Sequence, residues 1–139
     1  MTSDAQYVRT MGVFAVIAVV AWAAFAWTYR TFFPVAVSHG DPLGIWWLWL
    51  LGGTVGFIVL FEACSRALAV PSSWRLPAAV AATAPALVCD VLTGTQPQWW
   101  LAGAGEAADA RYLALIVGGV GVLQLYAMLT SPPPGPTTR

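Results

Sequence analysis

The candidates for chemistry are the ionisable residues inside apolar segments. Asp90 lies near the end of the stretch Leu76–Leu92, and Arg30 and Arg111 are expected at the same depth. A charge in the middle of a membrane-spanning helix costs ~2.5–3.5 kcal/mol, so such residues pair with one another or mark a functional site. We therefore expect Asp90 to pair with Arg30 and Arg111. The trio is either a clamp between helices or an outward-facing site for an anionic substrate or a proton.

Glu62 and Arg66 form a second candidate pair. Residues four apart lie on one face of a helix, and the order acid before base is the favourable one. The pattern predicts a local ion pair about one turn inside the cytoplasmic boundary of the membrane. The alternative is a proton or cation site at the same place.

Motifs of familiar catalytic and metal centres are missing. His39 is the only histidine, and it is expected in a loop with Asp41, so two ligands are too few for a metal and most Ser–His or Cys–His enzymes are disfavoured. Cys64 and Cys89 are expected ~15 Å apart in depth, too far for a disulfide and more consistent with small apolar side chains. We expect a non-enzymatic protein with no cofactor and no metal.

The elements that must position these residues are four long apolar runs: Met11–Trp27, Gly44–Leu60, Leu76–Leu92 and Tyr112–Leu129. Each is about as long as a helix that crosses a hydrocarbon core of ~30 Å. Hydrophobic residues make up 59% of the chain and charged residues 9%, which is too few charges for a soluble domain. The sequence predicts an all-α, four-helix transmembrane bundle with antiparallel up-down topology in a lipid bilayer. A cleaved signal in place of the first span is the alternative.

The boundaries follow from proline, serine and charged residues. We expect a polar tail over residues 1–10, a membrane domain over 11–130 and a disordered proline-rich tail over 131–139. Ser73 is expected to cap the third helix after a tight turn at Pro71, and Pro85 is expected inside that helix. The helices are predicted over Val8–Phe33, ending before Pro34, and, after a loop at Val35–Pro42, over Leu43–Val70, Trp74–Leu92 and Glu106–Leu129.

Arginine and tryptophan predict the orientation. An even number of spans puts both termini on one side, with Arg9, Arg66, Arg75 and Arg139 there and Arg30 and Arg111 on the other. The excess favours cytoplasmic termini. Net charge is zero and lysine is absent, so a nucleic-acid partner is disfavoured. Six tryptophans are expected at the outer interface as anchors, or as the lining of a groove for a lipid or an apolar ligand: Trp27, Trp46, Trp47, Trp49, Trp99 and Trp100.

Small residues recur along every predicted helix and allow close packing. Gly52 and Gly56 either pack inside the bundle or form a leftover seam for a homodimer or a membrane-protein partner. Gln124, a polar residue within the last apolar run, is expected to donate an interhelical hydrogen bond.

The stretch Ala84–Leu92, an apolar helix with Pro85 that ends near Asp90, carries a resemblance. With the aromatic loop at Trp99 and Trp100 and the last apolar helix, it resembles a family of small bacterial four-helix integral membrane proteins known only as a domain of unknown function. Ala86 stands where that family is expected to have glycine. The resemblance implies four spans and importance for Asp90, but no activity.

Two functions are therefore expected. The first is a non-enzymatic accessory or scaffold protein in a membrane complex. The second is a small transporter or channel component that uses Asp90 with Arg30 and Arg111 as its site.

Overall fold

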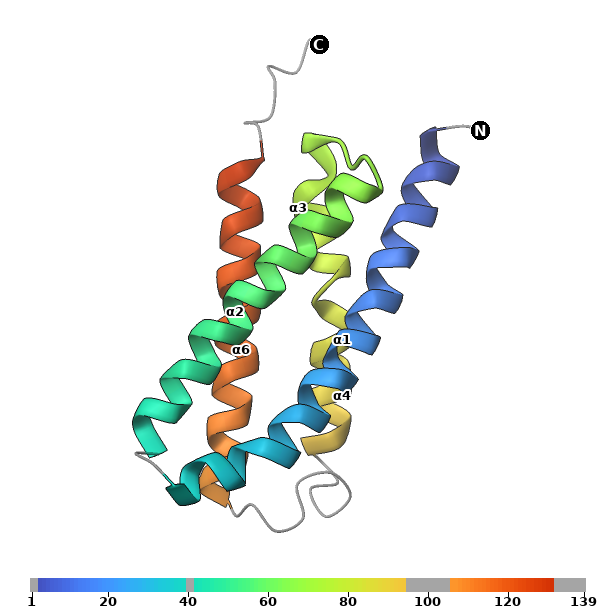
Figure 1. Cartoon of the computed structure of the whole chain (residues 1–139). Helices are drawn as coiled ribbons and strands as arrows, with labels where there is room; N and C mark the ends of the chain where they lie inside the picture. Colours follow the sequence, from blue (N-terminus) through green and yellow to red (C-terminus); the bar gives the residue numbers. More distant parts are fainter. Residues whose placement is uncertain (1–2, 40–41, 95–105, 132–139) are drawn as a thin grey trace.

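The computed structural model describes residues 3–39, 42–94 and 106–131, and these segments form a helical bundle without a strand (Figure 1). The start of α1 and the end of α6 lie at one end of the molecule, and the junction of α1 with α2 lies at the other. The predicted all-α class is confirmed for the described residues. The elements are α1 (Ser3–His39), α2 (Pro42–Ala67), η1 (Ser72–Trp74), α3 (Arg75–Ala81), α4 (Ala84–Gly94) and α6 (Glu106–Thr130).

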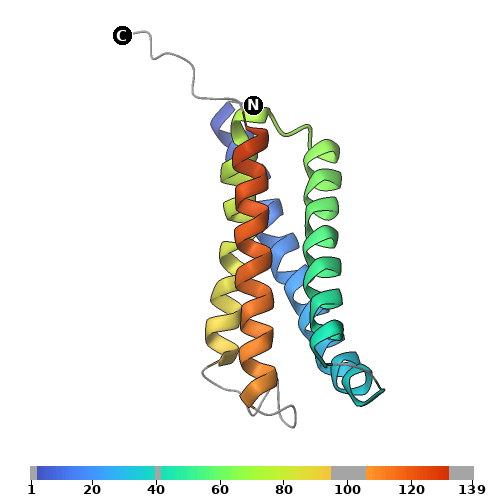
Figure 2. The same cartoon turned by 90° about the vertical axis from the view of Figure 1, so that its left-hand side faces the viewer.

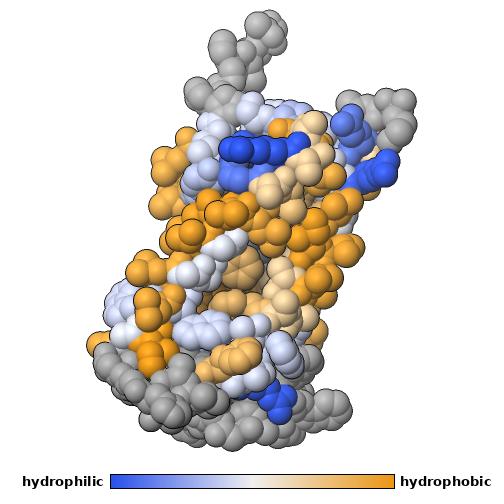
Figure 3. Space-filling view, viewed as in Figure 1, coloured by the Kyte–Doolittle hydropathy of each residue, from blue (hydrophilic) through white to orange (hydrophobic). Residues whose placement is uncertain are grey.

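Three segments are long and apolar enough to cross a membrane: Asp4–Phe32, Leu43–Ala67 and Ser72–Leu92. The described part of α6 adds a shorter apolar helix, Ala114–Thr130. Figure 3 shows hydrophobic residues over the middle of the molecule, with hydrophilic residues gathered toward the end that carries the N-terminus. The most apolar stretch of α2 contains no buried residue. Large apolar side chains of α2 are exposed, among them Leu48, Leu51, Val55 and Val59.

Helices α1 and α6 each lie beside both α2 and the α3–α4 pair (Figure 2). Small residues make this approach close: Ala78, Ala79 and Ala127 are completely buried. Two buried clusters result. The cluster nearer the chain ends holds Phe14, Phe61, Ala78, Ala79, Leu123 and Ala127. The other holds Tyr29, Tyr112, Leu115 and Ile116.

Helix α1 is longer than predicted at both ends. It begins at Ser3, within the expected polar tail, and Asp4 in its first turn suits the positive end of the helix dipole. It also continues through Pro34 to His39, so the predicted stop and most of the predicted loop at Val35–Pro42 are wrong. Proline removes the hydrogen bond to the carbonyl four residues earlier and its ring crowds that carbonyl, but a membrane helix can continue past one such gap.

Helix α2 ends at Ala67 rather than at the predicted Val70, and the reason is its cap. The Val70 N–H donates to the Ser65 carbonyl at 2.9 Å, and the Ala69 N–H donates to the Arg66 carbonyl at 3.1 Å. This pair of bonds is the Schellman arrangement, which requires a left-handed residue after the helix. Ala69 is that residue, with φ of 48°. The turn to α3 is therefore closed by backbone hydrogen bonds at the cost of strain at one alanine.

Replacing Ala69 with glycine is expected to stabilise the protein by about 1 kcal/mol, because glycine adopts the left-handed conformation without a Cβ clash. The measurement is equilibrium unfolding in mixed detergent. Ala67→Gly is the matched control, since Ala67 is helical and exposed and glycine there lowers helix stability. A loss of stability in both variants would contradict the strain at Ala69.

The predicted third helix is divided. The 3₁₀ turn η1 precedes it, Trp74 rather than Ser73 occupies the N-cap, and no side chain caps it. Helix α3 then ends at Ala81 and α4 begins at Ala84. Pro85 explains the break, because it has no N–H for the Ala81 carbonyl and its ring crowds that carbonyl.

Thr83 and Gln124 supply hydrogen bonds at this break. The Thr83 hydroxyl donates to the Ala79 carbonyl at 2.9 Å, and the Gln124 side-chain amide donates to the Thr83 hydroxyl oxygen at 3.1 Å. The predicted interhelical donor is thus confirmed. The break in α3–α4 is tied to α6 at the middle of the bundle.

Candidate functional site

Asp90 of α4 is buried, with 3% of its surface exposed. Its Oδ1 accepts a hydrogen bond of 2.7 Å from the indole Nε1–H of Trp22, which is itself buried on α1. The two residues are 68 positions apart in the chain. A hydrogen bond to a buried charged group is stronger than a neutral one, so this contact fixes α1 against α4.

Aromatic rings extend the site along the buried face of α1 and onto α6. Phe25 and Tyr29 follow Trp22 at intervals of three and seven residues, which keeps all three near one face of the helix. The rings of Tyr29 and Tyr112 lie 5.1 Å apart, and those of Phe25 and Tyr112 lie 6.3 Å apart. The Tyr112 hydroxyl is buried and lies beside the Asp90 carboxyl group and the Trp22 indole. Asp90 therefore lies in a buried region in which a few polar side-chain atoms are surrounded by aromatic rings.

Of the two arginines expected beside Asp90, the structure describes the side chain of Arg30 only. Arg30 is exposed on α1, eight residues beyond Trp22, or ~12 Å along the helix. Arg111 belongs to α6, but its side chain lies outside the described residues. The pairing of Asp90 with Arg30 and Arg111 stays a prediction. Sequence reasoning missed Trp22, although an indole N–H in the same bundle as one acid was a usable signal.

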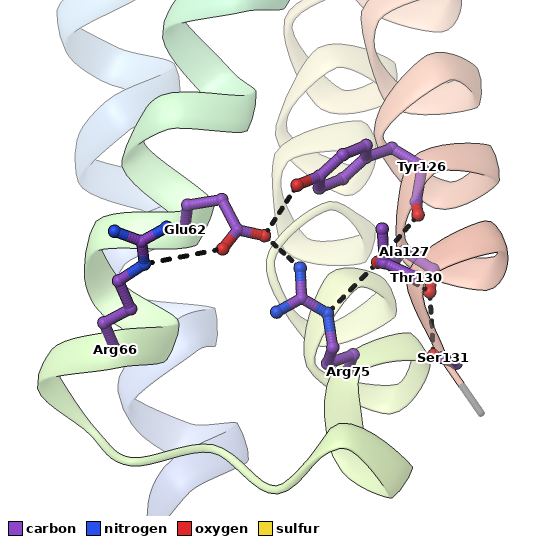
Figure 4. A network of polar contacts seen from close by, with 7 residues as sticks. All are labelled: Glu62, Arg66, Arg75, Tyr126, Ala127, Thr130 and Ser131. Atoms are coloured by element: carbon purple, nitrogen blue, oxygen red, sulfur yellow. Dashed lines mark hydrogen bonds and ion pairs between the residues drawn. The ribbon is translucent and has the colours of Figure 1, made fainter.

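Glu62 lies at the other end of the bundle, and its main partner is Arg75 (Figure 4). The Arg75 guanidinium forms an ion pair with Glu62 Oε1, and the Tyr126 hydroxyl donates to the same oxygen at 2.9 Å. The predicted partner Arg66 is present at 3.9 Å from Oε2, but its side chain is 84% exposed, against 16% for Arg75. The predicted local pair is confirmed as a contact. It is the longer and more solvated of two.

Arg75 connects three helices through this network. Its Nε donates to the Thr130 hydroxyl oxygen at 3.1 Å, and its guanidinium lies 5.5 Å from the centre of the Phe61 ring and 5.9 Å from that of Tyr126. Glu62 lies near the end of α2 and Arg75 is the first residue of α3, and opposite charges on either side of one turn were the sequence signal available for their pairing. Glu62 and Arg75 neutralise each other, and the Tyr126 hydroxyl and the aromatic rings supply further contacts to the pair. This network therefore serves as a structural clamp.

An apolar cavity of about 50 Å³ lies between α1 and α2, with the α3–α4 break and α6 behind it. Figure 3 shows a hollow in the face formed by α1 and α2. Trp22 is the one residue that both lines this cavity and bonds to Asp90. The lining consists of Phe14, Ile17, Ala18, Ala21, Trp22, Phe57, Leu60, Phe61, Cys64, Ala82, Thr83, Ala86, Ile116, Gly119, Val120 and Leu123. We call this hollow the α1–α2 groove.

The remaining sequence candidates add no further site. Neither Cys64 nor Cys89 forms a disulfide with another described residue, and both are half-buried. Within the described segments no three His, Cys, Asp or Glu side chains lie together as metal ligands would. The side chain of His39, residue Asp41 and the tryptophans Trp99 and Trp100 lie outside the described residues.

Comparisons with known proteins found no match: no protein-family model matches the chain, and neither a curated protein nor a solved structure is significantly similar to it. The resemblance to small four-helix membrane proteins stays a prediction. Function must therefore be argued from the site itself.

Proposed function

We propose that the protein is an integral membrane protein with four antiparallel spans, in which α3 and α4 together form the third, and with both termini in the cytoplasm. Three apolar segments of spanning length, the apolar α6 and the exposed apolar side chains support this proposal. Accessibility of tags at each terminus and in the segment 95–105 tests it. Termini on opposite sides of the membrane would contradict it.

Within that membrane the protein acts, we propose, as a small transporter or channel component whose proton-linked site is Asp90. The observation that carries this proposal is the burial of Asp90, at 3% exposure, inside the bundle. The Trp22 N–H needs an oxygen acceptor. A neutral side-chain amide would supply one at a lower desolvation cost than a carboxylate in a low-dielectric interior. A buried carboxyl group inside a membrane-spanning helix is the type of residue that carries protons in transporters and pumps.

Proton flux into proteoliposomes loaded with a pH-sensitive dye tests this role. Under an imposed membrane potential, the wild-type protein is expected to carry protons, and Asp90→Asn is expected to abolish the flux. Glu62→Gln is the matched control, because Glu62 belongs to the clamp with Arg75 and not to the Asp90 site. Equal flux through wild type and Asp90→Asn would contradict the proposal.

The second candidate is a non-enzymatic accessory or scaffold role in a membrane complex, and the outward face of α2 favours it. An added Cβ at Gly52 or Gly56 would meet nothing within 4 Å, whereas one at Gly53 would lie 3.2 Å from Phe25. Gly53 therefore packs inside, and Gly52 and Gly56 are left on the exposed side with the exposed guanidinium of Arg66. A transmembrane helix of another membrane protein fits such a face.

Replacing Gly52 and Gly56 with leucine tests this second role. The variant is expected to lose a co-purifying membrane partner that the wild type retains. Gly12→Leu is the matched control, because Gly12 is also exposed with open space around it, but on α1. Retention of the partner by the leucine variant would contradict docking on α2. If the wild type associates only with itself, the occupant of this face is a second copy of the chain.

A further inference from the structure

Side chains from two other helices meet Asp90 of α4, and they differ in what they can do with a proton. Trp22 of α1 donates its indole N–H to Oδ1 at 2.7 Å. Tyr112 of α6 places its hydroxyl beside the same carboxyl group. Both Asp90 Oδ2 and the Tyr112 hydroxyl oxygen are shielded from solvent. A proton that reaches Asp90 must therefore pass through a neighbouring side chain or through water that enters the bundle.

The side of Asp90 that faces the α1–α2 groove offers no such passage. An indole N–H is a donor only, so Trp22 cannot accept a proton and pass it on. Aliphatic and aromatic side chains dominate the lining of the groove behind Trp22, and an apolar cavity of this kind stays dry. The Thr83 hydroxyl in that lining already donates to the Ala79 carbonyl and accepts from Gln124.

Tyr112 lies on the other side and has the required chemistry. A phenol hydroxyl both donates and accepts, so it can give one proton and take another. The Tyr112 ring lies 5.1 Å from that of Tyr29 and 6.3 Å from that of Phe25. Tyr29 follows Trp22 by seven residues, or ~10 Å along α1 toward its junction with α2. Tyr112 therefore covers Asp90 on the side that faces this junction.

We propose that Tyr112 passes protons between Asp90 and water that enters from the end of the bundle at the α1–α2 junction. This inference rests on the Asp90 site proposed above and names its proton route. When Asp90 is loaded, the O–H bond of Tyr112 breaks as an O–H bond forms on Asp90 Oδ2, and the Tyr112 oxygen takes a proton from a hydronium ion. Release follows the same steps in reverse. One proton moves in each case, and Tyr112 ends with its hydroxyl restored.

Proton flux through Tyr112→Phe in proteoliposomes tests the proposal. The substitution removes the hydroxyl and keeps the ring that packs against Tyr29 and Phe25. Flux is expected to fall at least about tenfold, because positioned acid–base groups contribute this much or more to proton transfer. Tyr126→Phe is the matched control, since it removes a hydroxyl from the same helix at the Glu62 clamp, and it should keep wild-type flux. Wild-type flux through a folded Tyr112→Phe variant would overturn the proposal.

Site-specific incorporation of fluorotyrosine at position 112 separates proton transfer from packing, and it keeps the test decisive if Tyr112→Phe does not fold. Fluorotyrosine retains the ring and the hydroxyl but holds its proton less tightly. A purely structural role predicts wild-type flux, whereas transfer through Tyr112 predicts a change of about twofold or more, because transfer rates follow the proton affinity of the group. The same replacement at Tyr126 is the control. Unchanged flux with fluorotyrosine at position 112 would overturn the proposal.

The two proposals fail in different ways. Flux that is abolished by Asp90→Asn but unaffected by both changes at Tyr112 would keep the Asp90 function and remove the route through Tyr112. Flux that is unaffected by Asp90→Asn would remove both.

Discussion

Arg75→Met is expected to destabilise the protein by about 3 kcal/mol, because it leaves the Glu62 carboxylate partly buried with one remaining close donor, the Tyr126 hydroxyl. The loss also removes the contact of Arg75 with Thr130, so α2, α3 and α6 lose a common tie. Equilibrium unfolding in mixed detergent measures the change in free energy.

Arg66→Met is the matched control for this prediction. It also removes one positive charge next to Glu62, but that charge belongs to a side chain that is 84% exposed and lies 3.9 Å from the carboxylate. Solvated ion pairs contribute little, so a change below about 0.5 kcal/mol is expected. Similar losses in the two variants would show that Glu62 depends on net positive charge nearby rather than on the contact with Arg75.

Trp22→Phe is expected to cost about 2–3 kcal/mol, because the Asp90 Oδ1 loses its indole donor in a buried position. Asp90→Asn keeps an oxygen that accepts from Trp22, so its stability should stay within about 1 kcal/mol of wild type. The measurement is unfolding at constant pH. The comparison separates the hydrogen bond from the charge.

The result for Asp90→Asn also decides how the flux experiment is interpreted. A stable Asp90→Asn variant without proton flux assigns the charge to function. A loss of stability as large as that of Trp22→Phe would instead indicate that the carboxylate charge is paired within the bundle. The predicted partner Arg111 would then be the next residue to replace, with Arg111→Met expected to be as unstable as Asp90→Asn.

Helix ends were predictable where the chain stops being apolar, but not where a cap or a proline decides them. Helix α6 begins at the predicted Glu106 and ends one residue beyond the predicted Leu129. Pro34 and Pro85 were both recognised, yet α1 continues through the first and α3 ends before the second. The outcome depends on the surrounding hydrogen bonds, and at Pro85 these include the contact of Gln124 with Thr83 from another helix.

The partners of the charged residues were predicted from their depth in the membrane, and these predictions were only partly right. The spacing of Glu62 and Arg66 identified one contact, while the closer one, with Arg75, comes from the next helix. Trp22 lies within the first predicted helix, and its hydrogen bond to Asp90 was not predicted. In both cases the position along the helix axis was readable, and the rotation of each helix about its axis was not.

The amino-acid sequence alone predicted a helical chain with four apolar segments of membrane-spanning length and with acids inside them, because length and hydrophobicity are properties of consecutive residues; three such segments are present among the described residues. Only the tertiary structure decided that Asp90 bonds to Trp22, that Glu62 bonds to Arg75, and that a groove remains between α1 and α2. Those contacts depend on how helices rotate and cross, and close packing of small residues such as Ala78, Ala79 and Ala127 sets that geometry.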